Sequence, residues 1–79
     1  MITVEARLSA ALRDQLGIAD TKPMPVELPA DSTLPDLYRL LGLAPEQVAF
    51  TTVNNRYPNE GYRLQDGDHL RIVARAVGG

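Results

Sequence analysis

The residues of this sequence that could do chemistry stand at its end, where Arg75-Ala76-Val77 leads into Gly78-Gly79. Glycine loses the most backbone entropy on ordering and has no side chain to pack, so two glycines add little to a folded domain. They suit a segment that must enter a narrow channel in a partner, because no Cβ blocks either side. A terminal carboxylate on Gly79 would be unhindered and anionic at neutral pH. It could attack an activated phosphate; the alternative is an ordinary frayed terminus.

The composition limits the other chemistry that is possible. The 79 residues suffice for one small domain, and they include no cysteine. This excludes disulfides, thiolate nucleophiles and cysteine-ligated zinc or iron–sulfur centres. The net charge of −2 gives no reason to expect nucleic-acid binding, and no apolar run approaches the length of a membrane span. We expect no metal site and no membrane association, and the lack of a signal-peptide pattern indicates a cytoplasmic protein.

Period-2 alternation and β-branched residues predict the strands that position the glycines. Strands are expected over 2–8, 24–29, 49–53 and 69–74, with a further short strand within 56–64. Prolines occupy outward positions of the second segment, which favours an edge strand because proline cannot donate to a ladder. The residues of the third segment, 49–53, do not show which alternate set of side chains faces inward.

Two helices are expected between these strands. A short helix over 10–16 follows Ser9, a good N-cap residue. The main helix follows Thr33, with Asp36 in place for a capping box, and it ends at Gly42. Its apolar residues fall at i, i+3, i+4 and i+7, so they form one stripe that can cover a sheet: Leu34, Leu37, Tyr38 and Leu41.

The order of elements predicts an α+β domain over 1–74, followed by a flexible tail over 75–79. The first and last strands can pair in parallel, because a crossover connection separates them. If the tail is extended, at roughly 3.3–3.6 Å per residue, it reaches on the order of 17 Å beyond the fold. That length is enough to enter the active site of another protein.

Four features occur together over the whole chain: the element order, Val53-Asn54 after the third strand, a turn over 64–68, and Gly78-Gly79. In this combination the sequence resembles the ubiquitin-like sulfur carriers of the MoaD/ThiS family, which include the small subunit of molybdopterin synthase and the thiamin sulfur carrier. The resemblance implies a β-grasp (ubiquitin-like) fold with a mixed four- to five-stranded sheet. It also implies that an E1-like enzyme, using ATP and Mg²⁺, adenylates Gly79, which then becomes a thiocarboxylate.

The resemblance further implies a carrier that is not itself an enzyme and binds no cofactor. Its partners would be the adenylating enzyme and a sulfur-accepting synthase, either the molybdopterin synthase large subunit or thiazole synthase. The helix over 10–16 is similar to the molybdopterin branch, which we slightly prefer, whereas the ending over 75–79 is nearer the thiamin carriers. Arginine pairs bidentately with carboxylates, and we expect these residues to meet the partner: Arg71, Val73, Arg75, Ala76, Val77 and Gly78.

Two alternatives remain open at this point. The same tail could join the protein to lysines of other proteins, as in a ubiquitin-like modifier, or the domain could be a plain β-grasp interaction module. His69, next to Asp68, is expected to be solvated, because a catalytic or metal-binding histidine needs converging partners. The sequence shows no nucleophile–base pair and no phosphate-binding glycine loop.

Overall fold

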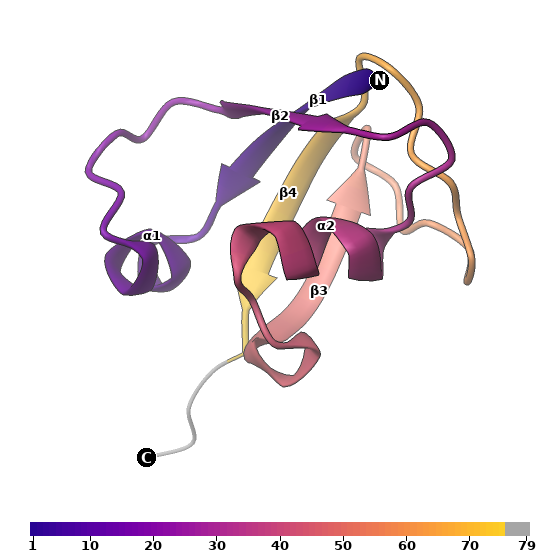
Figure 1. The fold of residues 1–79 in the computed structure, drawn as a ribbon. Coiled ribbons are helices and arrows are strands. Elements are labelled where there is room, and N and C mark those ends of the chain that lie inside the picture. Colours follow the sequence, from indigo (N-terminus) through magenta and orange to yellow (C-terminus); the bar gives the residue numbers. More distant parts are fainter. Residues whose placement is uncertain (76–79) are drawn as a thin grey trace.

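The computed structural model describes residues 1–75; the predicted tail residues 76–79 lie outside the described part. Seven elements follow one another along the chain (Figure 1): β1 (Ile2–Leu8), α1 (Ala10–Leu16), β2 (Met24–Leu28), α2 (Leu34–Leu41), the 3₁₀ helix η1 (Pro45–Gln47), β3 (Val48–Val53) and β4 (His69–Ala74). None of the helices within residues 1–75 combines the length and apolar character needed to cross a membrane.

The four strands form one mixed sheet in the order β2-β1-β4-β3. β1 runs antiparallel to β2 and parallel to β4, while β3 pairs antiparallel with β4. The predicted pairing of the first and last strands is therefore confirmed, and β4 lies inside the sheet with a neighbour on each side. β2 is an edge strand, as its prolines indicated, and Pro25 is exposed.

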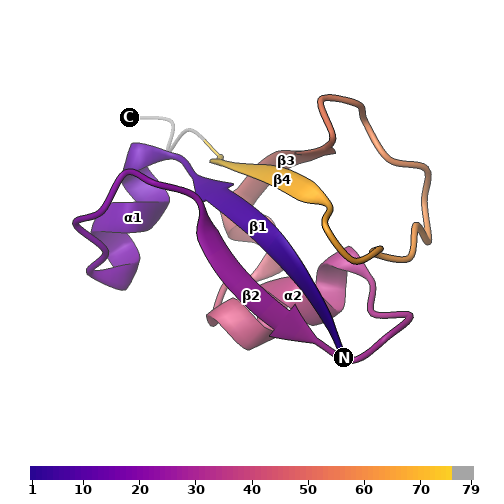
Figure 2. The same cartoon turned by 90° about the horizontal axis from the view of Figure 1, so that it is seen from above.

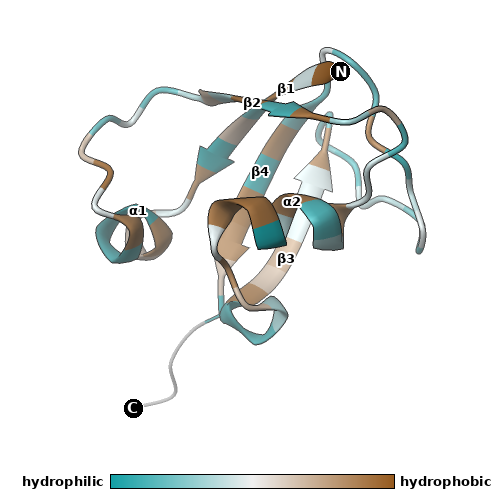
Figure 3. Cartoon of the chain, in the orientation of Figure 1, coloured by the Kyte–Doolittle hydropathy of each residue, from teal (hydrophilic) through white to brown (hydrophobic). Residues whose placement is uncertain are grey.

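The helix α2 crosses one face of the sheet, whereas no helix within residues 1–75 covers the opposite face, called the open face below (Figure 2). The alternation in β1 puts Val4, Ala6 and Leu8 on the α2 side, and all three are buried. Figure 3 shows that α2 contains both apolar and polar residues, and its Leu37 is completely buried. The buried core comprises Val4, Ala6, Leu8, Leu12, Val26, Leu28, Leu37, Leu43, Val48, Val53, Leu64, Leu70 and Ile72.

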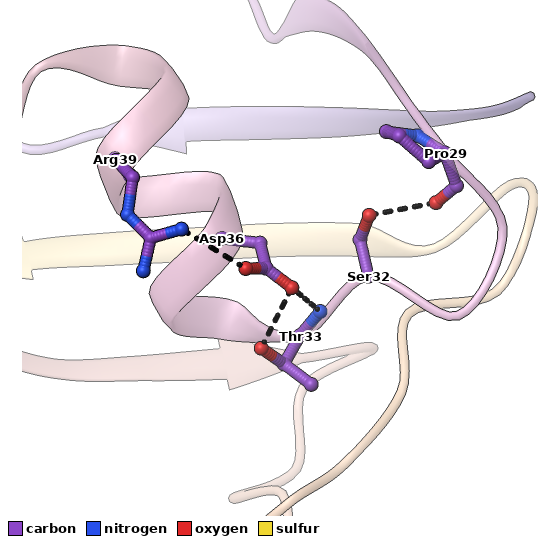
Figure 4. Close-up of polar contacts among 5 residues, drawn as sticks. All are labelled: Pro29, Ser32, Thr33, Asp36 and Arg39. Carbon is purple, nitrogen blue, oxygen red and sulfur yellow. Dashed lines mark hydrogen bonds and ion pairs between the residues drawn. The ribbon is translucent and has the colours of Figure 1, made fainter.

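The start of α2 is fixed by polar contacts that Figure 4 shows. The Thr33 amide donates to Asp36 Oδ2 at 3.0 Å, and the Thr33 hydroxyl donates to the same oxygen at 3.1 Å. These two bonds lower the pKa of the Asp36 carboxyl, the amide bond contributing most. Ser32, just before the helix, donates to the Pro29 carbonyl at 2.7 Å. The predicted pairing of Thr33 with Asp36 at the N-terminus of the helix is confirmed.

One element differs from the sequence prediction. The prediction of a short strand within 56–64 is wrong. This part of the chain forms only two isolated bridges, from Arg56 to Val53 and from Arg63 to Thr33. Pro58 lacks a ladder donor and Gly61 has a φ of 79°, so the backbone turns away from a strand path. The sheet therefore has four strands among residues 1–75, which is the lower end of the four to five strands expected.

A register shift in β3 explains why the sequence left its parity open. The pairing with β4 jumps between Val48 and Phe50, so Ala49 forms a bulge. After the bulge Thr51 and Val53 point into the core, and Phe50 stays 41% exposed on the open face. A residue inserted in this way breaks the simple alternation on which the sequence argument depends.

Candidate functional site

The end of β4, with Ala74 and Arg75, is the last part of the chain that the structure places before the predicted tail; we call it the tail exit. The Ser9 amide donates to the Ile72 carbonyl at 3.0 Å, and the Ala74 amide donates to Ser9 Oγ at 3.1 Å. On the other side, the Arg75 amide donates to the Gln47 carbonyl at 2.9 Å. Figure 1 shows β4 ending beside η1. The exit is therefore held from both sides up to Arg75.

The hydroxyl of Ser9 bonds to the tail exit and does not cap the helix that follows it. The sequence predicted Ser9 as the N-cap of α1, and it does occupy that position, but its hydroxyl makes no capping bond. Instead the hydroxyl accepts from Ala74, 65 positions along the chain. Parallel pairing of β1 and β4 brings these two residues together. The bond joins the β1–α1 junction to the end of β4.

Arginines gather on the open face beside the exit. Arg71 is exposed, and its register partner in β1 is Arg7, which is also exposed. Arg75 is exposed at the end of β4. Of the ion pairs found among residues 1–75, none involves Arg7 or Arg71. Such side chains present guanidinium groups that can bind carboxylates or phosphates bidentately.

Next to the arginines lies an apolar area, of which sequence analysis named Val73 but missed the aromatic residues Phe50 and Tyr57. Val73 is partly buried and pairs with Phe50, the exposed residue after the β3 bulge. The ring of Phe50 meets that of Tyr57 edge to face, with centroids 5.9 Å apart, and Tyr57 is 74% exposed. Aromatic side chains that stay exposed beside arginines are typical of protein–protein interfaces. Only the bulge at Ala49 could have revealed Phe50, and the sequence gives no signal for it.

A buried carboxylate stabilises the turn before β4. Asp68 is 5% exposed and accepts hydrogen bonds from the Asn54 side chain at 3.0 Å, the Tyr62 hydroxyl at 2.8 Å and the Gln65 amide at 2.9 Å. The bond to this carboxylate is the main cause that raises the pKa of Tyr62. These contacts fix the long loop to the strand that carries the exit, so Asp68 is structural.

His69 is exposed, as the sequence indicated. Its Nδ1 lies 3.1 Å from Glu5 Oε2, and both side chains are at least half exposed. No group of three or more metal-ligating side chains occurs within residues 1–75. This part of the chain therefore offers carboxylate, arginine and aromatic contacts on the open face, without a clustered metal site.

The structure brings three of the predicted partner-contacting residues to one area. Arg71 and Val73 lie on the open face, and Arg75 follows at the exit. The other predicted residues, Ala76, Val77, Gly78 and Gly79, lie outside the described residues.

No protein-family model matches this sequence, and no curated protein matches it. Solved structures do match. A protein described as molybdopterin converting factor, subunit 1, from Pyrococcus furiosus has a TM-score of 0.75 and 21% identity, over 96% of this chain and 100% of that chain. Two crystal structures of small archaeal modifier protein 1 from Haloferax volcanii each have a TM-score of 0.70. Their identities are 18% and 20%, over 92% and 98% of this chain and 97% and 99% of theirs.

The fold is a ubiquitin-like β-grasp. The resemblance stated from the sequence is confirmed at the level of the fold. In this β-grasp domain the central strand β4 leads to the tail exit, and the open face beside it carries arginines and aromatic rings.

Proposed function

We propose that this protein is a sulfur carrier whose terminal Gly79 carboxylate is adenylated by an E1-like enzyme and then converted to a thiocarboxylate. One observation carries the proposal: the central strand of a β-grasp fold is held up to Arg75, and the glycine pair Gly78-Gly79 follows three and four positions later. Four extended residues span at most roughly 14 Å. That length suits a carboxylate that must reach a catalytic site in another protein.

The chemistry of the carrier needs little from the domain itself. Adenylation joins the Gly79 carboxylate to the α-phosphate of ATP and releases pyrophosphate, so a poor acyl donor becomes a good one. A sulfur donor then displaces AMP from the acyl group. ATP, Mg²⁺ and the catalytic groups belong to the partner, and this chain contributes a slim acyl end and a docking surface. It is therefore a co-substrate, not an enzyme.

The docking surface that we propose combines Arg71, Val73 and Arg75 with Phe50 and Tyr57. The arginines favour an acidic partner surface, and the exposed rings supply apolar contact area next to the exit. Ala76, Val77 and Gly78 would lie inside the channel of the partner. All five tail residues would then contact the enzyme that acts on Gly79.

The sulfur acceptor that we favour is a molybdopterin synthase large subunit, with thiazole synthase as the alternative. Support comes from the helix α1 after the first strand and from the similarity to the protein described as molybdopterin converting factor, subunit 1. The same proposal implies a cytoplasmic location, because adenylation consumes ATP.

A second function, protein modification, is favoured by a specific observation. Two of the similar structures are of a small archaeal modifier protein, over at least 92% of this chain. A modifier would use the same adenylated Gly79 but would pass its acyl group to a lysine. The two functions therefore share the first step and differ in the acceptor. A plain interaction module would use neither step.

Intact-mass measurement distinguishes these three possibilities. The intact mass of the purified protein is first measured to establish that its chain ends at Gly79. The protein is then incubated with an E1-like enzyme, ATP, Mg²⁺ and a sulfur donor. A mass gain equal to sulfur minus oxygen supports the carrier, and conjugates joined through a lysine isopeptide bond support the modifier. An unchanged mass with an enzyme that charges its own carrier contradicts both functions.

A further inference from the structure

A cavity with basic walls lies between the open face, α1 and the loop before β2. It has a volume of about 350 Å³ and includes Arg7, Arg13 and Arg71, with the hydroxyl residues Ser9 and Thr21. No aspartate or glutamate within residues 1–75 lines it. Three guanidinium groups around one cavity are unusual in a chain whose net charge is −2. With no carboxylate in the lining, the cavity carries positive charge that can attract an anion.

The register of the sheet makes the repulsion specific. Arg7 and Arg71 are direct partners in the parallel β1–β4 pair, and both side chains are on the exposed side. Like charges placed directly opposite in a sheet are destabilising. The Glu5 carboxylate lines a neighbouring cavity with both arginines, and it lies 3.1 Å from His69 Nδ1. It forms no ion pair with either arginine.

Arg13 supplies an independent observation. Its Nε atom is buried and has no hydrogen-bond partner among residues 1–75. Buried donors in proteins are almost always bonded, so an unpaired guanidinium N–H calls for a partner that residues 1–75 do not provide. The same residue lines the cavity. Arg13 comes from α1, so three elements of the chain meet at the cavity.

We propose that this cavity is a binding site for a phosphate group, either free or as part of a nucleotide. Three positive charges with no lining carboxylate match a multiply charged anion better than a single carboxylate. Arginine also binds phosphate with two parallel N–H···O bonds. The hydroxyls of Ser9 and Thr21 add neutral donors to the same wall. The site lies on the fold itself and does not depend on the proposed role of Gly79.

A titration of the folded, full-length protein tests the site. ¹⁵N–¹H spectra are recorded with inorganic phosphate, pyrophosphate and AMP, each against sodium chloride at the same ionic strength. We expect saturable shifts at the amides of Ser9, Arg13 and Thr21, and a melting temperature that rises with phosphate concentration. A response to inorganic phosphate identifies a free phosphate site, and a response to AMP alone identifies a nucleotide site. Shifts that do not saturate, or that chloride reproduces, would overturn the proposal.

Arginine substitutions make the test specific. The double variant R7Q/R71Q is expected to bind the same probe about tenfold more weakly or worse, because it loses two bidentate contacts. Without phosphate, its melting temperature should equal or exceed that of the wild type, since the like-charge repulsion is gone. Arg63→Gln, an exposed arginine outside the cavity, is the matched control and should bind as the wild type does. Equal affinity of the double variant and the control overturns the proposal, and the single variant Arg7→Gln applies the same comparison should the double variant not fold.

Discussion

Asp68 is the residue on which the geometry before β4 depends. Its carboxylate is buried and accepts bonds from Asn54, Tyr62 and Gln65, which lie in the turn after β3 and in the long loop. In addition, the Asp68 carbonyl accepts from the Glu5 amide at 2.9 Å. The loop over 56–64, which has no strand of its own, is held in this way.

Replacement of Asp68 by alanine removes the acceptor and leaves its donors unsatisfied. We expect the free energy of unfolding to fall by about 1–3 kcal/mol, measured by urea denaturation. Glu60→Ala is the matched control, because Glu60 is an exposed acidic residue with no hydrogen bond or ion pair found among residues 1–75. It should stay within about 0.5 kcal/mol of the wild type. Similar losses in the two variants would show that Asp68 has no special role.

The pair of Tyr62 and Asp68 predicts a pH dependence at alkaline pH. The pKa of Tyr62 is raised in the folded protein, mainly by its bond to the Asp68 carboxylate. The bond therefore stabilises the fold at pH values below the unfolded pKa of a tyrosine, about 10, and this stabilisation is lost as pH rises through the folded pKa. Tyr62→Phe should be less stable at neutral pH and should lack this component of the alkaline decline. Denaturation between pH 7 and pH 11 measures both.

A tyrosine elsewhere provides the control for this profile. The hydroxyl of Tyr57 makes no hydrogen bond found among residues 1–75, and the residue is 74% exposed. Tyr57→Phe should keep the neutral-pH stability and the alkaline decline of the wild type. If Tyr62→Phe behaves in the same way as Tyr57→Phe, the bond between Tyr62 and Asp68 does not contribute to stability.

At the scale of elements, α2 closes the core against the sheet. Leu37 is completely buried on its inner side, and Leu40 is 57% exposed on its outer side. Leu37→Ala should lower the free energy of unfolding by about 2–5 kcal/mol, because the cavity left behind adds to the lost transfer energy. Leu40→Ala makes the same chemical change on the same helix and should cost little. Chemical denaturation of both variants measures the difference; equal effects would contradict this placement of α2.

The elements themselves could largely be predicted from the sequence, because their signals are local. Alternation in 2–8 and the apolar stripe of the main helix depend on neighbours a few positions away. The bulge at Ala49 and the missing strand over 56–64 could not be predicted. A bulge is fixed by pairing with β4, and the loop is held by the Asp68 contacts, which join residues up to 14 positions apart.

At the scale of the whole molecule, the candidate site was predicted only in part. The glycine pair, Arg71 and Arg75 could be chosen from residue types and order alone. The parallel register that places Arg7 beside Arg71, and Ser9 beside Ala74, arises from strands more than 60 positions apart. Phe50 joins Val73 only because of the bulge. Tertiary pairing of this kind leaves no local pattern in the sequence.

The charge on the open face leads to a prediction about docking. Under the proposed function, R71E/R75E should weaken binding to the E1-like enzyme about tenfold or more at low salt, because attraction to an acidic surface becomes repulsion. The difference should shrink at high salt, where exposed charges are screened. Arg63→Glu is the control, since it changes an exposed arginine in the loop that pairs with Thr33. Isothermal titration calorimetry gives the affinities; an unchanged affinity of R71E/R75E at low salt would remove these arginines from the docking surface.

The central claim concerns one atom group, the carboxylate of Gly79. Trypsin cleaves after Arg75 and so releases residues 76–79 as a separate peptide. After incubation with the E1-like enzyme, ATP, Mg²⁺ and a sulfur donor, tandem mass spectrometry should place an oxygen-to-sulfur exchange on the last residue of this peptide, and omission of ATP should prevent it. A peptide that keeps its original mass, while the same enzyme charges its own carrier in the same tube, would contradict the account.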